Sequence, residues 1–185
     1  MKEYRTNEDL IEYLSSKGVI ISDKSDALQK IERYTYYSIV NTYKSIFKGE
    51  DGNYIDNVTF DEIYALFEFD KGLKNIILKY CLEIETVIKS IMANQISKVY
   101  GVKEYLNTSN WDSSIDDDIK ENLLNKINSE IEKDYNTHTA VTHYIDKYGF
   151  VPPFVLVKIL TFGVASSYYG LLKQSDRQAI AKYLK

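Results

Sequence analysis

Apolar positions recur at steps of three and four residues most regularly between residues 60 and 101, and this spacing predicts one long helix there. Thr59 stands three residues before Glu62, the spacing of a capping box at a helix start. A glycine follows the last apolar position and suits a left-handed cap. The stretch has no proline and only Gly72 as an interior glycine. An unbroken helix of this length would span roughly 60 Å, so we expect a bend at Gly72 or in the Tyr80–Cys81 region.

Apolar residues lie on more than one side of this predicted helix. One set recurs at steps of three and four residues, which is the spacing of a face packed against a core: Ile63, Leu66, Leu73, Ile77, Tyr80, Ile84, Val87 and Ile91. A second set lies beside it: Phe67, Phe69, Ile76, Leu82, Ile88, Met92 and Ile96. Because the apolar side chains on both sides have to be buried by other elements, we predict an all-α fold, a single helical domain around a long central helix at about 60–100.

Shorter helices joined by polar loops are predicted on either side of the long one. The segment 34–47 has helical spacing, although its β-branched and aromatic content leaves a strand open. Trp111 is expected to pack on the core. No internal repeat or second domain is evident, so residues 1–185 are read as one domain. The other predicted helices cover residues 10–17, 23–31, 116–135 and 153–171, with a last one capped by Ser175-Asp176-Arg177.

Composition and charge indicate the cellular location of the protein and which partners it is expected to lack. The net charge of −4 and pI near 5.3 argue against indiscriminate electrostatic binding of nucleic acid, but a local basic groove stays compatible with them. No apolar run reaches the roughly 18 residues that span a bilayer, and the N-terminus has no signal segment. The single cysteine, Cys81, allows no disulfide within the chain. We therefore expect a cytoplasmic protein without a membrane partner, with Cys81 in the core.

Residue patterns for catalysis or metal binding are scarce. The eight glycines form no phosphate-binding loop. His138 and His143 are five residues apart, so they do not share a helical face, and no H-E-x-x-H pattern surrounds them. Asp116-Asp117-Asp118 is expected to favour a helix N-terminus, because adjacent helical positions cannot converge on one ion. We predict no metal, no small-molecule cofactor and no catalytic residue.

Two ion pairs are predicted on the long helix. Asp70 precedes Lys74 by four residues, and Glu85 precedes Lys89 by four, which is the favoured orientation for helical pairs. Their apolar neighbours indicate partial burial and a structural role for Asp70 and Glu85. Downstream, Asn94-Gln95 interrupts an apolar run, so one of the two is expected to face a groove or a partner.

Two stretches of the sequence, the predicted long helix and the segment from residue 143 onwards, resemble the Abi-like family of bacterial abortive-infection proteins of the AbiD/AbiF type. The first carries F-x-x-[IL]-x-x-[LY]-[FY]-x-F-D-x-x-[LM] and then I-E-x-x-[IL]-[RK]; matching residues are Phe60, Ile63, Phe67, Phe69, Asp70, Leu73, Ile84, Glu85, Ile88 and Lys89. For the second stretch the family pattern is H-Y-x-x-K-Y, a P-P-x-W-x-x-x-E-x-[LM]-[ST]-F-G segment and D-R-x-x-[IV]-A, but Phe154 replaces the usual tryptophan here and Lys158 the usual acid. Its matching residues are His143, Tyr144, Lys147, Tyr148, Pro152, Pro153, Leu160, Thr161, Phe162, Gly163, Asp176, Arg177, Ile180 and Ala181.

The resemblance implies a HEPN-like helical bundle that binds RNA or a regulatory partner. Lys74 and Lys89 stand where the family usually has arginine, and Gln95 stands where many relatives carry histidine. His143 and Lys147 belong to the H-Y-x-x-K-Y element. We expect these five residues to contact RNA or a partner. Family members usually continue into an R-N-x-x-x-H segment like that of HEPN ribonucleases, and this sequence reaches Lys185 without one.

Three functions therefore stand side by side. The first is a phage-defence protein whose helical body binds RNA or a regulatory partner. The second is an intact HEPN-like ribonuclease, with His138 or His143 as its base. The third is a non-catalytic interaction module that forms a homodimer through an exposed face of the long helix.

Overall fold

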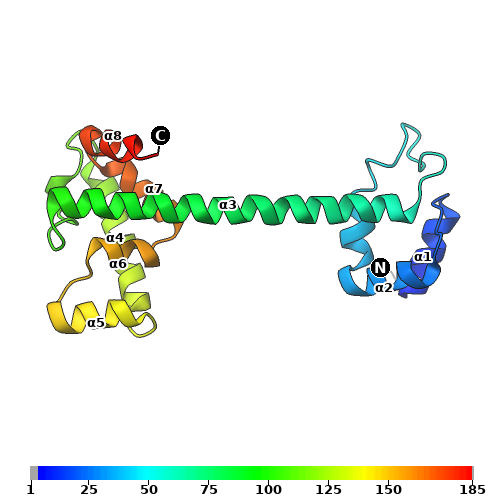
Figure 1. The fold of residues 1–185 in the computed structure, drawn as a ribbon, viewed down its shortest axis with the longest axis horizontal. Coiled ribbons are helices and arrows are strands. Elements are labelled where there is room, and N and C mark those ends of the chain that lie inside the picture. The colour runs from blue at the N-terminus through cyan, green and yellow to red at the C-terminus, as the bar shows by residue number, and fades with distance from the viewer. Residues whose placement is uncertain (1–3, 185) are drawn as a thin grey trace. The chain divides into compact units, whose positions relative to one another are not determined.

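The computed structural model describes residues 4–184 and is built from helices joined by turns and loops (Figure 1). Within these residues, β pairing is confined to two isolated bridges, Ile20–Thr59 and Lys48–Tyr54. The predicted all-α class is confirmed. The contacts divide the chain into two compact units, unit 1 (residues 1–79) and unit 2 (residues 80–185), and each has a hydrophobic core of its own.

The long helix is confirmed as α3 (Phe60–Tyr100). The backbone N–H of Glu62 donates to Thr59 Oγ1 at 3.1 Å, and the N–H of Thr59 donates to the Glu62 carboxylate at 2.8 Å, so the predicted capping box is formed. Gly101 follows at φ 74°, in the left-handed region. The helix continues through Gly72 and through Tyr80–Cys81, so neither position interrupts it.

The expectation that α3 is covered along its length is wrong for its middle. Ile63 is buried in the core of unit 1, and Met92 and Ile96 are buried in the core of unit 2. Between residues 69 and 87 the side chains expected in the core are exposed, and so is Cys81. Periodicity identifies an apolar face but carries no information about what covers it. The exposed core candidates are Leu73, Ile77, Tyr80, Ile84 and Val87.

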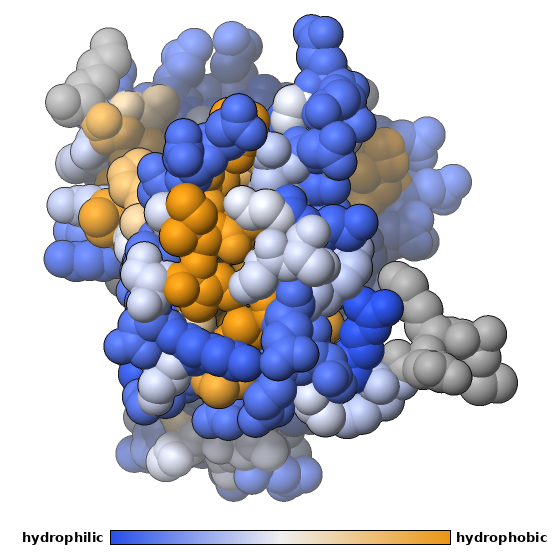
Figure 2. Space-filling model, turned by 90° about the vertical axis from the view of Figure 1, so that its right-hand side faces the viewer, coloured by the Kyte–Doolittle hydropathy of each residue, from blue (hydrophilic) through white to orange (hydrophobic). Residues whose placement is uncertain are grey.

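Unit 1 packs α1 (Asn7–Ser16), α2 (Lys24–Tyr34) and η1 (Tyr37–Asn41), a π-helical turn, with the first part of α3. The helix expected over 34–47 is reduced to η1, because Thr35 takes a positive φ of 66° and ends α2. Figure 2 shows the side of unit 1 that carries α1, a largely hydrophilic surface with a hydrophobic patch at its centre and smaller hydrophobic areas towards its edges. The buried core is made of Ile11, Leu14, Val19, Ala27, Ile31, Ile39, Val40, Val58, Phe60 and Ile63.

Unit 2 surrounds the last turns of α3 with shorter helices. They are η2 (Thr108–Asn110), α4 (Asp117–Asp134), α5 (Thr139–Tyr148), α6 (Pro153–Ile159), α7 (Phe162–Leu171) and α8 (Gln174–Lys182). Trp111 is buried as predicted, with its ring 5.5 Å from that of Tyr168. The hydroxyl of Tyr168 donates to the carbonyl of Tyr105 at 2.9 Å, so the polar ends of these aromatic residues are satisfied inside the core.

Two predicted helices of unit 2 need correction. The helix expected over 153–171 is divided into α6 and α7, because Leu160 and Thr161 are extended and Thr161 Oγ1 accepts the N–H of Val164 as a new N-cap. The last helix is not capped by the Ser175-Asp176-Arg177 segment. Its N-cap is Lys173, and the side chain of Asp176 is directed into the unit instead.

Candidate nucleic-acid interface

The candidate residues predicted from the sequence lie in three different environments. Lys74 belongs to unit 1, where it is exposed. Lys89 and Gln95 lie near the end of α3 and contact the interior of unit 2. His143 and Lys147 are exposed on α5. The structure thus brings His143 and Lys147 together on one helix face and gives the other three separate partners.

Lys89 supports the packing of α3 against α6. Its Nζ lies 2.5 Å from Glu85 Oε1 and also donates to the carbonyl oxygen of Leu160 at 2.5 Å. Leu160 is the C-cap of α6, so the lysine satisfies a carbonyl at the negative end of that helix. Only 11% of the Lys89 side chain is exposed. The geometry is that of an internal cap.

Gln95 contributes to a second internal network. Its Nε2 donates to Asp176 Oδ1 at 3.0 Å, and the hydroxyl of Tyr100 donates to Asp176 Oδ2. Burial, together with the bond to this carboxylate, holds the pKa of Tyr100 well above its usual range. Asp176 lies in the first turn of α8, where the helix dipole also favours a negative charge. Sequence reasoning missed this role of Asp176 because its partners are about 80 residues away along the chain.

Lys74 forms an ion pair with Asp70 on the surface of unit 1. Its Nζ lies 2.6 Å from Asp70 Oδ2, and its side chain is 70% exposed. The hydroxyl of Tyr43 donates to the same carboxylate oxygen at 2.5 Å. The bond from Lys74, followed by the one from Tyr43, lowers the pKa of Asp70, and the bond to Asp70 raises the pKa of Tyr43 to about 12.

His143 and Lys147 belong to an exposed aromatic face of α5. Residues 143, 144, 147 and 148 share this face because positions four apart in a helix are neighbours. The His143 ring meets the rings of Tyr144 and Tyr148 edge-on, with centroids 5.4 and 6.0 Å away. The Lys147 ammonium lies 5.3 Å from the centroid of the Tyr148 ring, within the range of a cation–π contact. We call these four residues the α5 face.

The aromatic surface continues from α5 onto α6. The ring of Phe154 meets that of Tyr144 edge-on at 5.8 Å, and the ring of Phe150 lies 6.4 Å from that of Tyr148. Phe154 also lines a groove of about 530 Å³ between α3 and α6. We call it the α3–α6 groove; its lining includes Lys89, Ser90, Asn94, Phe154 and Lys158. One continuous surface of unit 2 therefore offers flat rings, amides and ammonium groups.

Two lysines of this surface, Lys147 and Lys158, differ from Lys89 in their surroundings. Among residues 4–184, no carboxylate lies within ion-pair distance of Lys147 or Lys158. The nearby acid Asp146 is engaged elsewhere, because its Oδ1 accepts a hydrogen bond from the hydroxyl of Tyr135 at 2.6 Å. Two positive charges on this surface are thus available to an anionic ligand.

A small polar hollow of about 380 Å³ borders His143. It is lined by Asn136, Thr137, Thr139, Thr142, His143 and Asp146. The other histidine, His138, precedes α5, and its buried Nδ1 has no hydrogen-bond partner among residues 4–184. The two predicted candidates for a general base therefore differ, because His143 is reachable from solvent and the Nδ1 of His138 is not.

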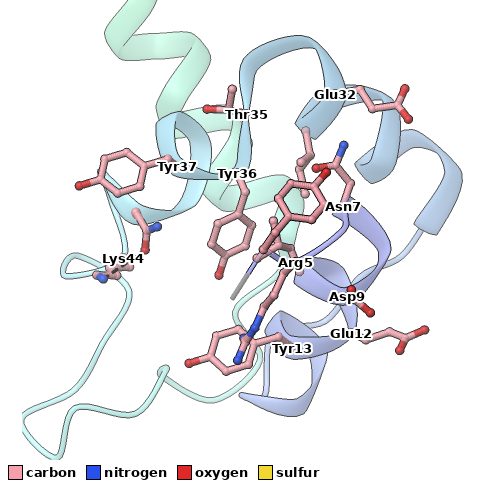
Figure 3. Close-up of a pocket in the computed structure, with 14 residues that line it drawn as sticks. Arg5, Asn7, Asp9, Glu12, Tyr13, Glu32, Thr35, Tyr36, Tyr37 and Lys44 are labelled. Carbon is pink, nitrogen blue, oxygen red and sulfur yellow. Dashed lines mark hydrogen bonds between the residues drawn. The ribbon is translucent and has the colours of Figure 1, made fainter. Parts of the chain in front are cut away.

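Unit 1 contains a hollow of about 1290 Å³ between the N-terminal segment, α1, α2 and η1 (Figure 3). The Arg5 guanidinium lies 4.8 Å from the centroid of the Tyr13 ring, and burial raises the pKa of Tyr36 to about 12. Carboxylates share the lining with the cations, since it includes Asp9, Glu12 and Glu32 as well as Arg5 and Lys44. This mixture of charges gives an anionic polymer no net attraction.

Between residues 4 and 184, no group of three histidine, cysteine or acidic side chains is arranged to hold a metal ion. Over the same residues, no helix has the length and the apolar character needed to cross a membrane.

Comparison with known proteins gives a family match. A model of the family described as Abi-like protein matches residues 29–185, which include most of α2 and everything that follows it. No curated protein and no solved structure matches the chain significantly. The HEPN-like arrangement of the helices therefore stays a prediction.

Proposed function

Since the chain belongs to the Abi-like family of abortive-infection proteins, we propose that it acts in phage defence by binding single-stranded RNA on the surface formed by the α5 face and the α3–α6 groove. The observation that carries the proposal is the contiguity of exposed rings and unpaired lysines in unit 2. Bases stack on aromatic side chains, and lysines neutralise phosphates. The net charge of −4 makes a local site necessary, because the chain as a whole repels RNA.

Each group on this surface has a role in the proposed complex. Tyr148 and Phe154 are about half exposed, so each ring offers a face to one base. Lys147 and Lys158 contact phosphates, and Asn94 and Ser90 in the groove supply hydrogen bonds. Lys89 and Gln95 act indirectly, by holding α6 and α8 against α3.

RNA binding is tested by fluorescence anisotropy with a labelled single-stranded RNA of mixed sequence, about 20 nucleotides long. Tyr148→Ala should weaken binding by about 5- to 150-fold, since stacking of one base contributes about 1–3 kcal/mol. Tyr183→Ala is the matched control, because Tyr183 is also exposed in unit 2 but lies after α8. An unchanged affinity in Tyr148→Ala would place the site elsewhere, and no binding at low salt would overturn the proposal.

The salt dependence separates the charged contribution from stacking. Lys147→Ala should reduce the slope of log K against log salt by about 0.7, the value for one phosphate of a single strand. Lys133→Ala serves as control, because Lys133 is exposed on α4 and already paired with Glu130 at 2.9 Å. Equal slopes for Lys147→Ala and the wild type would remove Lys147 from the interface.

Ribonuclease activity is the alternative function. His143 is then the candidate general base, because it is exposed beside the polar hollow. The RNA used for binding is incubated with the protein and analysed by gel electrophoresis. On our proposal the RNA stays intact. Cleavage that disappears in His143→Ala would establish the ribonuclease function and change the role of the α5 face from binding to catalysis.

A further inference from the structure

The α3–α6 groove is a hollow lined by both apolar and hydrogen-bonding side chains. Its lining comes from residues 82–94 of α3 and residues 154–158 of α6, all of them in unit 2. Its volume of about 530 Å³ is in the range of sites that bind small organic groups. A single base that has left the stack of its strand, together with its sugar, fits a hollow of this size.

Several polar side chains of the groove are already occupied within unit 2, but the amide of Asn94 is not. The hydroxyl of Thr86 donates to the carbonyl of Leu82 at 2.8 Å, and the ammonium of Lys89 lies 2.5 Å from Glu85 Oε1. The side chain of Asn94 is exposed and has no hydrogen-bond partner among residues 4–184. Its donor and its acceptor are therefore both available to a ligand.

The two helices contribute different chemistry to the groove. From α3, Ser90 and Asn94 lie one turn apart and present a hydroxyl and an amide. From α6, Phe154 presents a ring that is 44% exposed, and Lys158 follows it by one turn with an unpaired ammonium. A planar ligand with a polar edge and an attached negative charge matches this lining.

The amide of Asn94 narrows the choice of base. A carboxamide holds an N–H donor and a carbonyl acceptor side by side in one plane. Adenine complements it with two atoms, because its 6-amino group donates and the adjacent ring nitrogen accepts. Guanine presents two acceptors on the corresponding edge, and the pyrimidines have a smaller ring to stack on Phe154. In single-stranded RNA these edges are free, and they are the edges that proteins read.

We propose that the α3–α6 groove binds one unstacked adenine of the RNA, with Asn94 bonded to its edge and Phe154 stacked on its face. This inference rests on the RNA binding proposed above and adds a base preference to it. Lys158 contacts the phosphate next to the bound adenosine. The rings of the α5 face stack on neighbouring bases without distinguishing them, because every base has a ring face.

An exchange of one functional group in the RNA tests the base preference on the wild-type protein. The probe is a labelled oligouridine of about 12 nucleotides with one central adenosine, and the comparison RNA carries inosine at that position. Inosine keeps the purine ring and its stacking but has a keto oxygen in place of the 6-amino group. Fluorescence anisotropy should give an affinity about 5- to 150-fold higher for the adenosine RNA, the discrimination expected from one two-atom contact.

Three variants assign the preference to the groove. Asn94→Ala should bring the affinities for the two RNAs within about twofold of each other, while its affinity for all-uridine RNA stays that of the wild type. Asn125→Ala is the matched control, because Asn125 is also exposed in unit 2 but lies on α4, outside the groove. Phe154→Leu should weaken the binding of both RNAs and keep their ratio, because stacking tolerates every base.

The outcomes separate this inference from the function on which it rests. Equal wild-type affinities for the adenosine and inosine RNAs, or tighter binding of inosine, would overturn the adenine preference and leave RNA binding intact. A preference that survives in Asn94→Ala would overturn it as well, since another group would then read the base. If neither these RNAs nor all-uridine RNA bound at low salt, RNA binding itself would fail and the adenine preference with it.

Discussion

Two stretches of α3 carry the same acid-then-lysine spacing in opposite environments. Asp70 and Lys74 form a pair at 2.6 Å in unit 1, and Glu85 and Lys89 form one at 2.5 Å in unit 2. The side chain of Lys74 is 70% exposed and that of Lys89 is 11% exposed. Lys89 has a further acceptor, the carbonyl of Leu160, which comes from a segment 71 residues away.

The comparison shows that helical spacing places two charges together without fixing their energetic role. Water screens a surface pair, and its side chains lose conformational entropy when they are held together. A lysine that caps a helix inside a unit leaves acceptors without a donor when it is removed. The two lysines should therefore respond very differently to the same substitution.

The largest effect is expected from Lys89→Ala. The substitution leaves Glu85 and the Leu160 carbonyl without their shared donor, so it should lower the free energy of unfolding by about 1–3 kcal/mol. Urea unfolding followed by the fluorescence of Trp111, the single tryptophan and a core residue of unit 2, measures this loss. Lys89→Met, which keeps the apolar stem, is the control for packing and should lose a similar amount. Wild-type stability in both variants would contradict the internal-cap role.

Lys74→Ala should produce a much smaller effect. Because its ammonium is in water, the pair with Asp70 is screened by ions. Unfolding followed by far-ultraviolet circular dichroism should show a slight loss at low salt, which disappears at about 1 M salt, where the Debye length is about 3 Å. A loss as large as that of Lys89→Ala would show that exposure does not distinguish the two pairs.

The smallest effect is expected from Tyr43→Phe, which should lower stability slightly at neutral pH and weaken the loss of stability at alkaline pH. The bond to Asp70 raises the pKa of Tyr43 to about 12, above about 10 in the unfolded chain. Its contribution to stability is therefore complete below about pH 10 and is lost as the pH rises towards 12. Tyr43→Phe should reduce this alkaline loss, and part should remain because burial raises the pKa of Tyr36 to about 12 as well. Urea midpoints at pH 8, 10 and 11 measure it.

The exposed Tyr37 provides the control for that measurement. Tyr37→Phe should keep the alkaline loss of the wild type. On the acid side, the lowered pKa of Asp70 means that its contribution is complete above about pH 4 and is lost as the pH falls. If Tyr43→Phe and Tyr37→Phe gave the same alkaline profile, the Tyr43–Asp70 bond would contribute nothing in solution.

Features set by neighbouring residues could be predicted from the sequence. The capping box of Thr59 and Glu62 fixed the start of α3, and Gly101 fixed its end, because both depend on backbone groups within one turn. The H-Y-x-x-K-Y residues come from the family resemblance alone, and the predicted helices do not include α5, which places these residues on one face. The pairs of α3 follow from a spacing of four residues.

Features set by distant segments could not be predicted. Periodicity marked Leu73 and Ile84 as apolar-face residues, and the structure leaves both exposed because the two cores form at the ends of α3. The division of the expected 153–171 helix depends on Leu160, whose carbonyl is bound by Lys89 from α3. The amide of Gln95 meets Asp176, which lies 81 residues later.

The sequence by itself therefore determined that this protein is helical, where its long helix begins and ends, and which side chains lie on one face of each helix. These properties follow from the repeat of 3.6 residues and from hydrogen bonds within one turn. Only the tertiary structure decided that Lys89 is enclosed while Lys74 is in water, and that Phe154 of α6 extends the rings of α5. Burial depends on which segments pack together, and that information is spread over the whole chain.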